Sequence, residues 1–134
     1  MPITLFTEMN MGDFTLYFLA FDNGQDYKGM SDEDKNKDRF TREGVLELTH
    51  NHGTESDPSF AGYASGNSEP GKGFGHIAIT VDNVETACAR FESLNVPFKK
   101  RPQDGKMRHI AFILDPDGYW IEIVPNTFKL DAKY

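Results

Sequence analysis

The chain has 134 residues, which is enough for one ordinary domain, and its 38% hydrophobic content excludes an intrinsically disordered protein. A formal net charge of −7 argues against nucleic acids and anionic membranes as partners, because both attract basic surfaces. The sequence contains no run of roughly 18 apolar residues and no signal peptide at its start, so we expect a soluble, cytoplasmic protein without membrane partners.

In the first half of the chain, two strands are predicted. Residues 14–21, FTLYFLAF, are rich in aromatic side chains, and residues 44–51, GVLELTHN, alternate between apolar and polar side chains. Between them, residues 30–44 carry charges of both signs and few apolar positions, so we interpret them as a solvated loop. Residues 53–75 are dense in Gly, Ser and Pro and predict a long irregular connection, a kind of segment that is often functional.

A strand is predicted next at residues 76–81, followed by a helix over residues 82–95. We expect Asp82 to cap the first turn of this helix together with Glu85. The apolar stripe of the helix comprises Val84, Ala87, Cys88, Phe91 and Leu94. Because the single cysteine lies on this stripe, we interpret it as a core residue and expect a reducing compartment.

Three further strands are predicted at residues 96–101, 107–114 and 119–124, with a tight turn at the DPDG sequence before the last one. From residue 76 onward the predicted order is therefore strand, helix, strand, strand, strand. Residues 125–134 are interpreted as a tail.

Three residues of the predicted strands suggest a metal site. Glu47 lies between two leucines and shares a strand face with Thr49 and Asn51. Glu122 likewise lies between two isoleucines, which is unusual for a charged residue in a strand. His76 opens its strand directly after the glycine-rich sequence GKGFG. One imidazole and two carboxylates suit a divalent first-row metal with open positions for substrate oxygens, which stabilises an enediolate. The alternative remains open, because strand glutamates are usually solvated and lone histidines are usually structural.

Four sequence motifs carry a resemblance to a known family. They are FTLYFLAF, GVLELTHNHGTE, GFGHIAITVDNV and DGKMRHIAFILDPDGYWIEIV, in this order over most of the chain. The chain resembles glyoxalase I (lactoylglutathione lyase) of the eukaryotic type. The resemblance implies an α+β fold of the vicinal oxygen chelate superfamily, which is built from paired βαβββ modules.

The resemblance also implies an activity and its residues. The family isomerises the hemithioacetal of glutathione and methylglyoxal to S-lactoylglutathione, using Zn²⁺, or Ni²⁺ in some bacterial members. Carried over to this chain, the metal ligands are Glu47, His76 and Glu122, with Glu122 as the catalytic base. The implied substrate contacts are Asn51, Lys72, His76, Lys106 and Met107. Lys72 replaces an arginine of the family, which keeps the charge but loses the bidentate geometry.

Two further basic residues, Lys100 and Arg101, are candidates for a small basic pocket, or equally for ordinary charges at a strand edge. The family usually has Trp where this chain has His52, which we interpret as structural.

The resemblance predicts an organisation into modules within a single domain, residues 1–134. A partial first module would span residues 1–72 and lack its first strand and helix, and a complete second module would span residues 73–124. We therefore expect an N-terminally truncated glyoxalase whose exposed apolar surface favours a homodimer.

Two other functions remain open at this point. The chain is alternatively a weakly active or inactive remnant that binds metal or glutathione. A thiol transferase or dioxygenase of the same superfamily is a further candidate, although a ring-cleaving dioxygenase would require two histidines and one glutamate.

Overall fold

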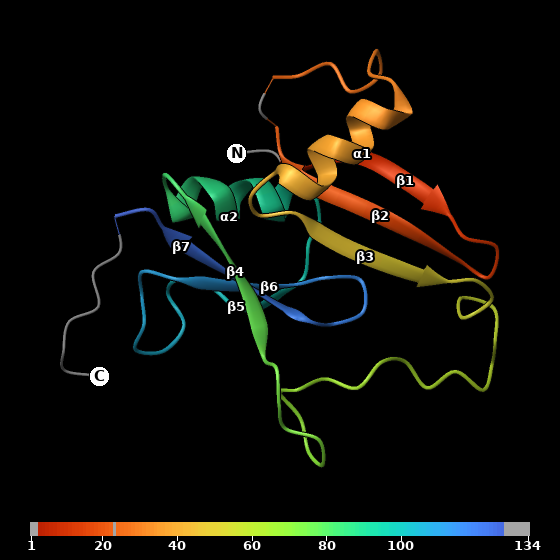
Figure 1. Cartoon of the computed structure of the whole chain (residues 1–134). Coiled ribbons are helices and arrows are strands. Elements are labelled where there is room, and N and C mark those ends of the chain that lie inside the picture. Colours follow the sequence, from red (N-terminus) through yellow and green to blue (C-terminus); the bar gives the residue numbers. More distant parts are fainter. Residues whose placement is uncertain (1–2, 23, 128–134) are drawn as a thin grey trace. The chain divides into compact units, whose positions relative to one another are not determined.

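The computed structural model describes residues 3–22 and 24–127. The chain divides into two compact units, Met1–Phe60 and Ala61–Tyr134 (Figure 1). Among the described residues, each unit contains a β-sheet and one α-helix, which confirms the predicted α+β class.

The first unit contains an antiparallel sheet of three strands in the order β1-β2-β3. These strands are β1 (Ile3–Asn10), β2 (Phe14–Phe21) and β3 (Leu46–Asn51), which lie side by side in Figure 1. The strands β2 and β3 confirm the two predictions for this half of the chain.

Strand β1 was not predicted from the sequence. It forms a tight hairpin with β2, closed by a hydrogen bond of 2.9 Å from the Met11 backbone N–H to the Phe14 carbonyl. Gly12 occupies the turn with φ +96°, a conformation that L side chains rarely adopt. The hairpin therefore depends on a glycine between two apolar runs.

The prediction of a loop over residues 30–44 is wrong, because α1 (Asp32–Thr41) forms within it. Ser31 caps this helix: its Oγ accepts a hydrogen bond of 3.1 Å from the Asp34 backbone N–H and donates one of 2.7 Å to the Asp34 carboxylate. Acidic residues in the first turn favour the helix further through its dipole.

Helix α1 buries a charged residue, Arg39, instead of an apolar stripe. The guanidinium carbon of Arg39 lies 4.4 Å from the centroid of the Phe18 ring on β2. One guanidinium nitrogen contacts Met9 Sδ at 2.8 Å, whereas the buried Nε has no hydrogen-bond partner. The apolar cluster of this unit is formed by Phe6, Phe18 and Ala20, with partly buried neighbours that all lie outside α1.

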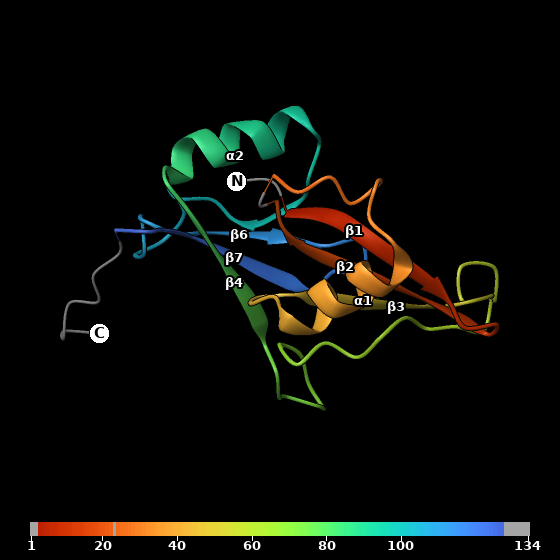
Figure 2. The same ribbon diagram turned by 45° about the horizontal axis from the view of Figure 1, so that its top comes forward.

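The second unit contains a four-stranded sheet in the order β4-β7-β6-β5, with α2 on one face (Figure 2). Strand β4 pairs in parallel with β7, and the other neighbours are antiparallel. The chain order of strand, helix and three strands confirms the predicted βαβββ arrangement. The elements are β4 (His76–Val81), α2 (Val84–Ser93), β5 (Phe98–Lys100), β6 (Ala111–Leu114) and β7 (Trp120–Pro125).

The core of this unit lies between α2 and the sheet. The buried side chains of the helix, Val84 and Cys88, pack against Ala111, Ile113 and Ile123 of the strands. Burial raises the pKa of the Cys88 thiol, and the nearby Glu92 carboxylate raises it further. The interpretation of Cys88 as a core residue is thus confirmed.

The loop after Phe60 belongs to the second unit, whereas the predicted module boundary lay after residue 72. The Tyr119 hydroxyl donates a hydrogen bond of 3.0 Å to the Ala64 carbonyl, which ties the loop to the start of β7. The Gly73 backbone N–H donates to the Gly66 carbonyl at 3.0 Å, so the loop also folds on itself. Residues 53–75 contain no helix or strand, as expected.

At the end of the second unit, Pro125 still belongs to β7, so the predicted tail begins one residue too early. The Asn126 backbone N–H donates a hydrogen bond of 2.9 Å to the Val81 carbonyl, and residues 128–134 lie outside the described residues. Neither α1 nor α2, within the described ranges 3–22 and 24–127, is long and apolar enough to cross a membrane.

The start of α2 corrects the predicted cap. Asn83 caps the helix, because its side-chain oxygen accepts a hydrogen bond of 2.7 Å from the Thr86 backbone N–H. The Asp82 carboxylate instead accepts a hydrogen bond of 2.8 Å from the Asn126 side chain. The helix ends at Ser93, two residues before the predicted end, and Asn95 then adopts φ 56°, a left-handed conformation typical of a residue that follows a helix.

Replacing the cap is expected to destabilise α2 and its core. Asn83→Ala should lower the free energy of unfolding by about 1 kcal/mol, because an orphan backbone N–H loses its partner. Urea denaturation followed by circular dichroism measures this change. Asp82→Ala serves as the comparison, and a larger loss for Asp82→Ala than for Asn83→Ala would contradict the assignment of the cap.

Candidate metal and substrate site

The parallel pairing of β4 with β7 brings His76 and Glu122 together. In the strand register His76 lies opposite Trp120 and Ala78 lies opposite Glu122, so His76 and Glu122 share one face of the sheet. The alternate residues of β7, Ile121 and Ile123, point to the other face and pack in the core with α2.

The two side chains are in direct contact. The imidazole Nε2 of His76 donates a hydrogen bond of 3.1 Å to Oε2 of Glu122, with side-chain exposures of 38% and 20%. A pair at this exposure contributes about 0–1 kcal/mol, so stability alone gives little reason for it. The ring of Phe112 stands edge-on to the His76 ring, with 5.2 Å between the ring centroids. The centroids of the Phe112 and Trp120 rings are 5.6 Å apart. The pair is therefore accessible from solvent but bordered by aromatic rings.

The geometry of this pair fits part of a metal site. Zinc binds imidazole nitrogen and carboxylate oxygen at about 2.0–2.2 Å, which places two ligand atoms of a tetrahedral ion about 3.3–3.6 Å apart. The observed separation of 3.1 Å between Nε2 and Oε2 is slightly shorter, so a small movement of either side chain would accommodate an ion. Nitrogen and oxygen donors suit zinc and nickel alike.

The third predicted ligand, Glu47, belongs to the first unit. Glu47 lies opposite Phe18 of β2 and Asn51 lies opposite Phe14, so both predicted site residues project from the same face of the first sheet, as expected. Their side chains are exposed. Within residues 3–22 and 24–127, no three His, Cys, Asp or Glu side chains form a metal-binding group. The structure thus brings together two of the three predicted ligands.

The predicted contacts for glutathione in the second unit lie on two loops. Lys72 forms an exposed ion pair of 2.9 Å with Glu69. Lys106 and Met107 lie on the loop between β5 and β6, where Lys106 is exposed and Met107 retains 45% of its accessible surface. All three side chains are therefore accessible to a ligand.

Lys100 and Arg101, the candidates for a small basic pocket, both have partners within the protein. Lys100 Nζ lies 2.6–3.2 Å from three backbone carbonyl oxygens, and Arg101 Nε forms an ion pair of 3.0 Å with Glu92 of α2. Sequence reasoning did not identify this use of Lys100, because a carbonyl acceptor leaves no trace in residue identity.

The hydrogen bonds of His52 support its interpretation as a structural residue. Nδ1 donates a hydrogen bond of 2.9 Å to the Gly12 carbonyl, and Nε2 lies 2.8 Å from the Thr15 hydroxyl. These contacts tie the end of β3 to the hairpin of β1 and β2. His50 forms a separate pair with Glu55 at 3.0 Å, and this hydrogen bond lowers the pKa of the Glu55 carboxyl.

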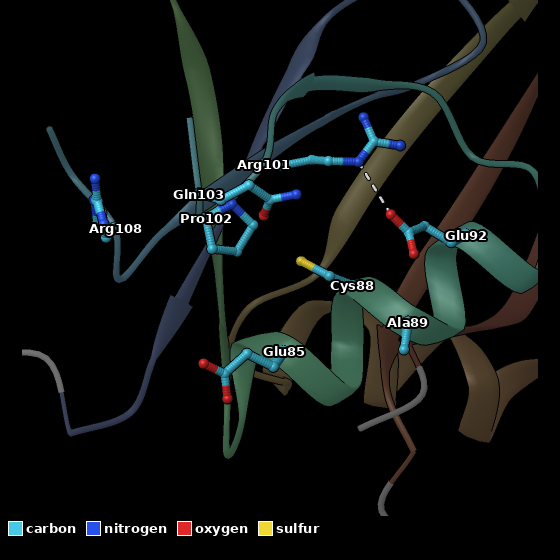
Figure 3. A pocket seen from close by; sticks show the side chains of 8 residues that line it. All are labelled: Glu85, Cys88, Ala89, Glu92, Arg101, Pro102, Gln103 and Arg108. Atoms are coloured by element: carbon cyan, nitrogen blue, oxygen red, sulfur yellow. Dashed lines mark hydrogen bonds and ion pairs between the residues drawn. The ribbon is translucent and has the colours of Figure 1, made fainter. Parts of the chain in front are cut away.

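A cavity of about 410 Å³ lies on the other side of the second unit, between α2 and the loop after β5 (Figure 3). The thiol of Cys88 points toward Pro102 and Gln103, and the ion pair of Glu92 with Arg101 borders the cavity. The helix side of the sheet is opposite to the face of His76 and Glu122. This cavity is therefore separate from the candidate metal ligands.

The sequence of this chain is similar to a described protein family and to individual relatives. Residues 27–123 match the family described as Glyoxalase/Bleomycin resistance protein/Dioxygenase superfamily. A lactoylglutathione lyase of Schizosaccharomyces pombe is 54% identical over 115 residues, which cover 86% of this chain and 36% of the relative. A lactoylglutathione lyase of Pseudomonas putida is 52% identical over 116 residues, which cover 85% of this chain and 64% of the relative.

A solved structure of a similar protein resembles this chain as well. A crystal structure of glyoxalase I from Zea mays is 26% identical, with a TM-score of 0.58, and covers 91% of this chain and 35% of the maize chain. The present chain thus spans between about one third and two thirds of the length of these relatives.

Proposed function

Because this chain belongs to the Glyoxalase/Bleomycin resistance protein/Dioxygenase superfamily, we propose that it acts as a lactoylglutathione lyase. It would isomerise the hemithioacetal of glutathione and methylglyoxal to S-lactoylglutathione. The similarity to lactoylglutathione lyases at 52–54% identity supports this activity. We also propose that the protein works in the cytoplasm.

The contact between His76 and Glu122 is the observation that carries the proposal. The two residues are 46 positions apart in the chain and lie on different strands. His76 Nε2 lies 3.1 Å from Glu122 Oε2 on an accessible face of the sheet. We propose that they hold Zn²⁺ or Ni²⁺ together with Glu47. When bound, such a metal acts as a Lewis acid toward the two neighbouring oxygens of the hemithioacetal.

Glu122 is the proposed catalytic base. The reaction removes a proton from the carbon that carries sulfur and returns a proton to the adjacent carbon, so no oxidant or reductant is consumed. The carboxylate of Glu122 accepts the first proton and donates it back, while the hydroxyl proton moves between the two oxygens. The rings of Phe112 and Trp120 border this position.

The glutathionyl part of the substrate carries two carboxylates, which favours contacts with basic side chains. Lys72 and Lys106 are the accessible basic residues proposed for this purpose, and Asn51 offers an amide on the same strand face as Glu47. In the free protein Lys72 is paired with Glu69, and exposed pairs of this kind contribute about 0–1 kcal/mol. A substrate carboxylate could therefore replace Glu69 as the partner of Lys72 with little loss of free energy.

The activity is directly testable. The purified chain with Zn²⁺ or Ni²⁺ should convert methylglyoxal and glutathione to a thioester, which is followed by its ultraviolet absorbance. Glu122→Gln should lower kcat by about 10²–10⁴-fold, because the amide cannot accept the proton. Circular dichroism checks that the variant is folded. If the wild-type chain forms no thioester with either metal, the assignment as a lyase is refuted and a binding remnant is left.

Metal binding is expected to depend on the proposed ligands. His76→Ala and Glu47→Ala should each weaken Zn²⁺ affinity by more than about 10-fold, since even changes behind the ligands cost about 10–100-fold. Competition with a chromogenic chelator measures the affinity. His50→Ala is a matched control, because His50 has a side-chain exposure of 39%, close to that of His76, and a carboxylate partner at 3.0 Å. Equal affinity of wild type, His76→Ala and Glu47→Ala would rule out this site.

We further propose a homodimer in which Glu47 of one copy joins His76 and Glu122 of a second copy. Glu47 belongs to the first unit, whereas His76 and Glu122 belong to the second, so two copies could each contribute one unit to a site. The first sheet also exposes apolar side chains on the face opposite to Glu47, among them Leu5 at 52%, Phe21 at 47% and Leu48 at 46%, and this surface favours a further contact of the chain apart from the one that would carry Glu47.

Mixing two inactive variants tests this dimer. Glu47→Ala and Glu122→Gln should each lack activity alone, whereas their mixture should regain about a quarter of the wild-type activity. Random pairing makes half of the dimers mixed, and each mixed dimer contains one intact site. Light scattering confirms that the chains associate. A mixture of associated chains that stays inactive would show that the ligands of one site come from a single copy.

A further inference from the structure

The first sheet has an apolar face that α1 does not cover. In the strand register, this face lies opposite to Glu47 and carries Leu5, Leu19, Phe21, Leu46 and Leu48. None of these five described residues belongs to the apolar cluster of the first unit. Helix α1 lies on the other face, since Arg39 stacks over Phe18, the cross-strand neighbour of Glu47. An exposed apolar face of this kind is typical of an interaction surface.

The second unit shows what covers a sheet face of the same pattern. Glu122 lies between two isoleucines of β7, as Glu47 lies between two leucines of β3. The isoleucines pack in the core with α2, where Ile123 retains 1% of its accessible surface. Leu48 occupies the corresponding position beside Glu47 and retains 46%. The same alternation therefore produces a core where a helix is present and an open apolar face where it is not.

The size of the apolar face matches that of one helix. The strands β1 and β2 have eight residues each. Because strands rise about 3.3 Å per residue and lie about 4.8 Å apart, the face of three strands measures roughly 26 Å by 14 Å. An α-helix with its side chains is about 10–12 Å wide and rises 1.5 Å per residue, so a helix of about 14–18 residues would cover this face.

Charge decides between a helix and a second copy of this chain as the occupant. Each chain carries a formal net charge of −7, so two copies repel each other. In the proposed metal site a cation would offset this repulsion, whereas an apolar face offers no such compensation. Among the described residues of the three strands, the acidic side chain on this face is Glu8, opposite Tyr17. A helix with a basic outer side is attracted to this acidic chain.

We propose that the apolar face of the first sheet is a docking site for an amphipathic helix of a second polypeptide. This helix presents apolar side chains at positions i, i+3, i+4 and i+7 to the sheet and basic side chains on its remaining surface. The inference rests on packing and charge alone, so it does not depend on the proposed lyase activity.

The test uses the purified full chain and two synthetic peptides of about 16 residues, the length that spans the face. Both peptides contain the same leucines, lysines and alanines, but the leucines form one helical stripe in the first peptide and are distributed around the helix in the second. Fluorescence anisotropy measures binding. The striped peptide should bind at least about tenfold more tightly and should slow amide hydrogen exchange in β1, β2 and β3.

Variants of the chain locate the contact. Leu48→Ser and Leu5→Ser should each weaken binding of the striped peptide by about tenfold, because each removes apolar area from the contact. Phe40→Ser is the matched control, since Phe40 is 75% exposed on α1 and lies outside the apolar face. It should leave binding unchanged. Circular dichroism checks that the variants are folded.

The other outcomes each contradict the proposal. Equal binding of the two peptides, or equal binding of the striped peptide by wild type, Leu48→Ser and Leu5→Ser, would show only general attraction between opposite charges. Failure of both peptides to bind would overturn the docking site as well. If the striped peptide does not bind and light scattering shows association that Leu48→Ser abolishes, a second copy occupies the face in place of a helix. Thioester formation is measured separately, and its failure leaves this inference unaffected.

Discussion

The parallel pairing of β4 with β7 is the constraint on which the candidate site depends. Because side chains alternate along a strand, this register directs His76 and Glu122 to one face and the isoleucines of β7 to the other. A slip of one residue would move Glu122 into the core and an isoleucine to the site. The burial of Ile123 against α2 therefore fixes the position of the proposed catalytic base. The six-residue strand β7 thus contributes its isoleucines to the core and Glu122 to the candidate site on its other face.

The elements with clear periodicity could be predicted from the sequence, and those held by polar contacts could not. The apolar stripe of α2 and the alternation in β4 and β7 predicted their positions and the core role of Cys88. Helix α1 lacks such a stripe, although the cap formed by Ser31 and Asp34 was a readable signal of its start. Strand β1 was missed because only its pairing with β2, across a glycine turn, makes it a strand.

At the site, residue types indicated the chemistry, but distances came only from the fold. The sequence gaps between Glu47, His76 and Glu122 carry no information about convergence, and the structure supplies it for two of the three. The shared face of Glu47 and Asn51 followed from alternation alone. By contrast, the partners of Lys100 are main-chain carbonyl oxygens. Every residue carries such a carbonyl, so the residue types do not show which ones Lys100 contacts. Its placement could therefore be found only in three dimensions.

The burial of Arg39 has a consequence for the behaviour of the first unit. Helix α1 adds no side chain to the apolar cluster of this unit within the described residues, and its buried contact is a guanidinium stacked over Phe18. Such a contact contributes about 0.5–2 kcal/mol, far less than the burial of a full apolar stripe. The contacts that hold the helix on the sheet are thus mainly polar, and the hydrogen bond of the Tyr27 hydroxyl to Asp38 adds to them. Local opening of residues 32–41 would consequently expose Phe18 while disturbing few apolar contacts of the cluster.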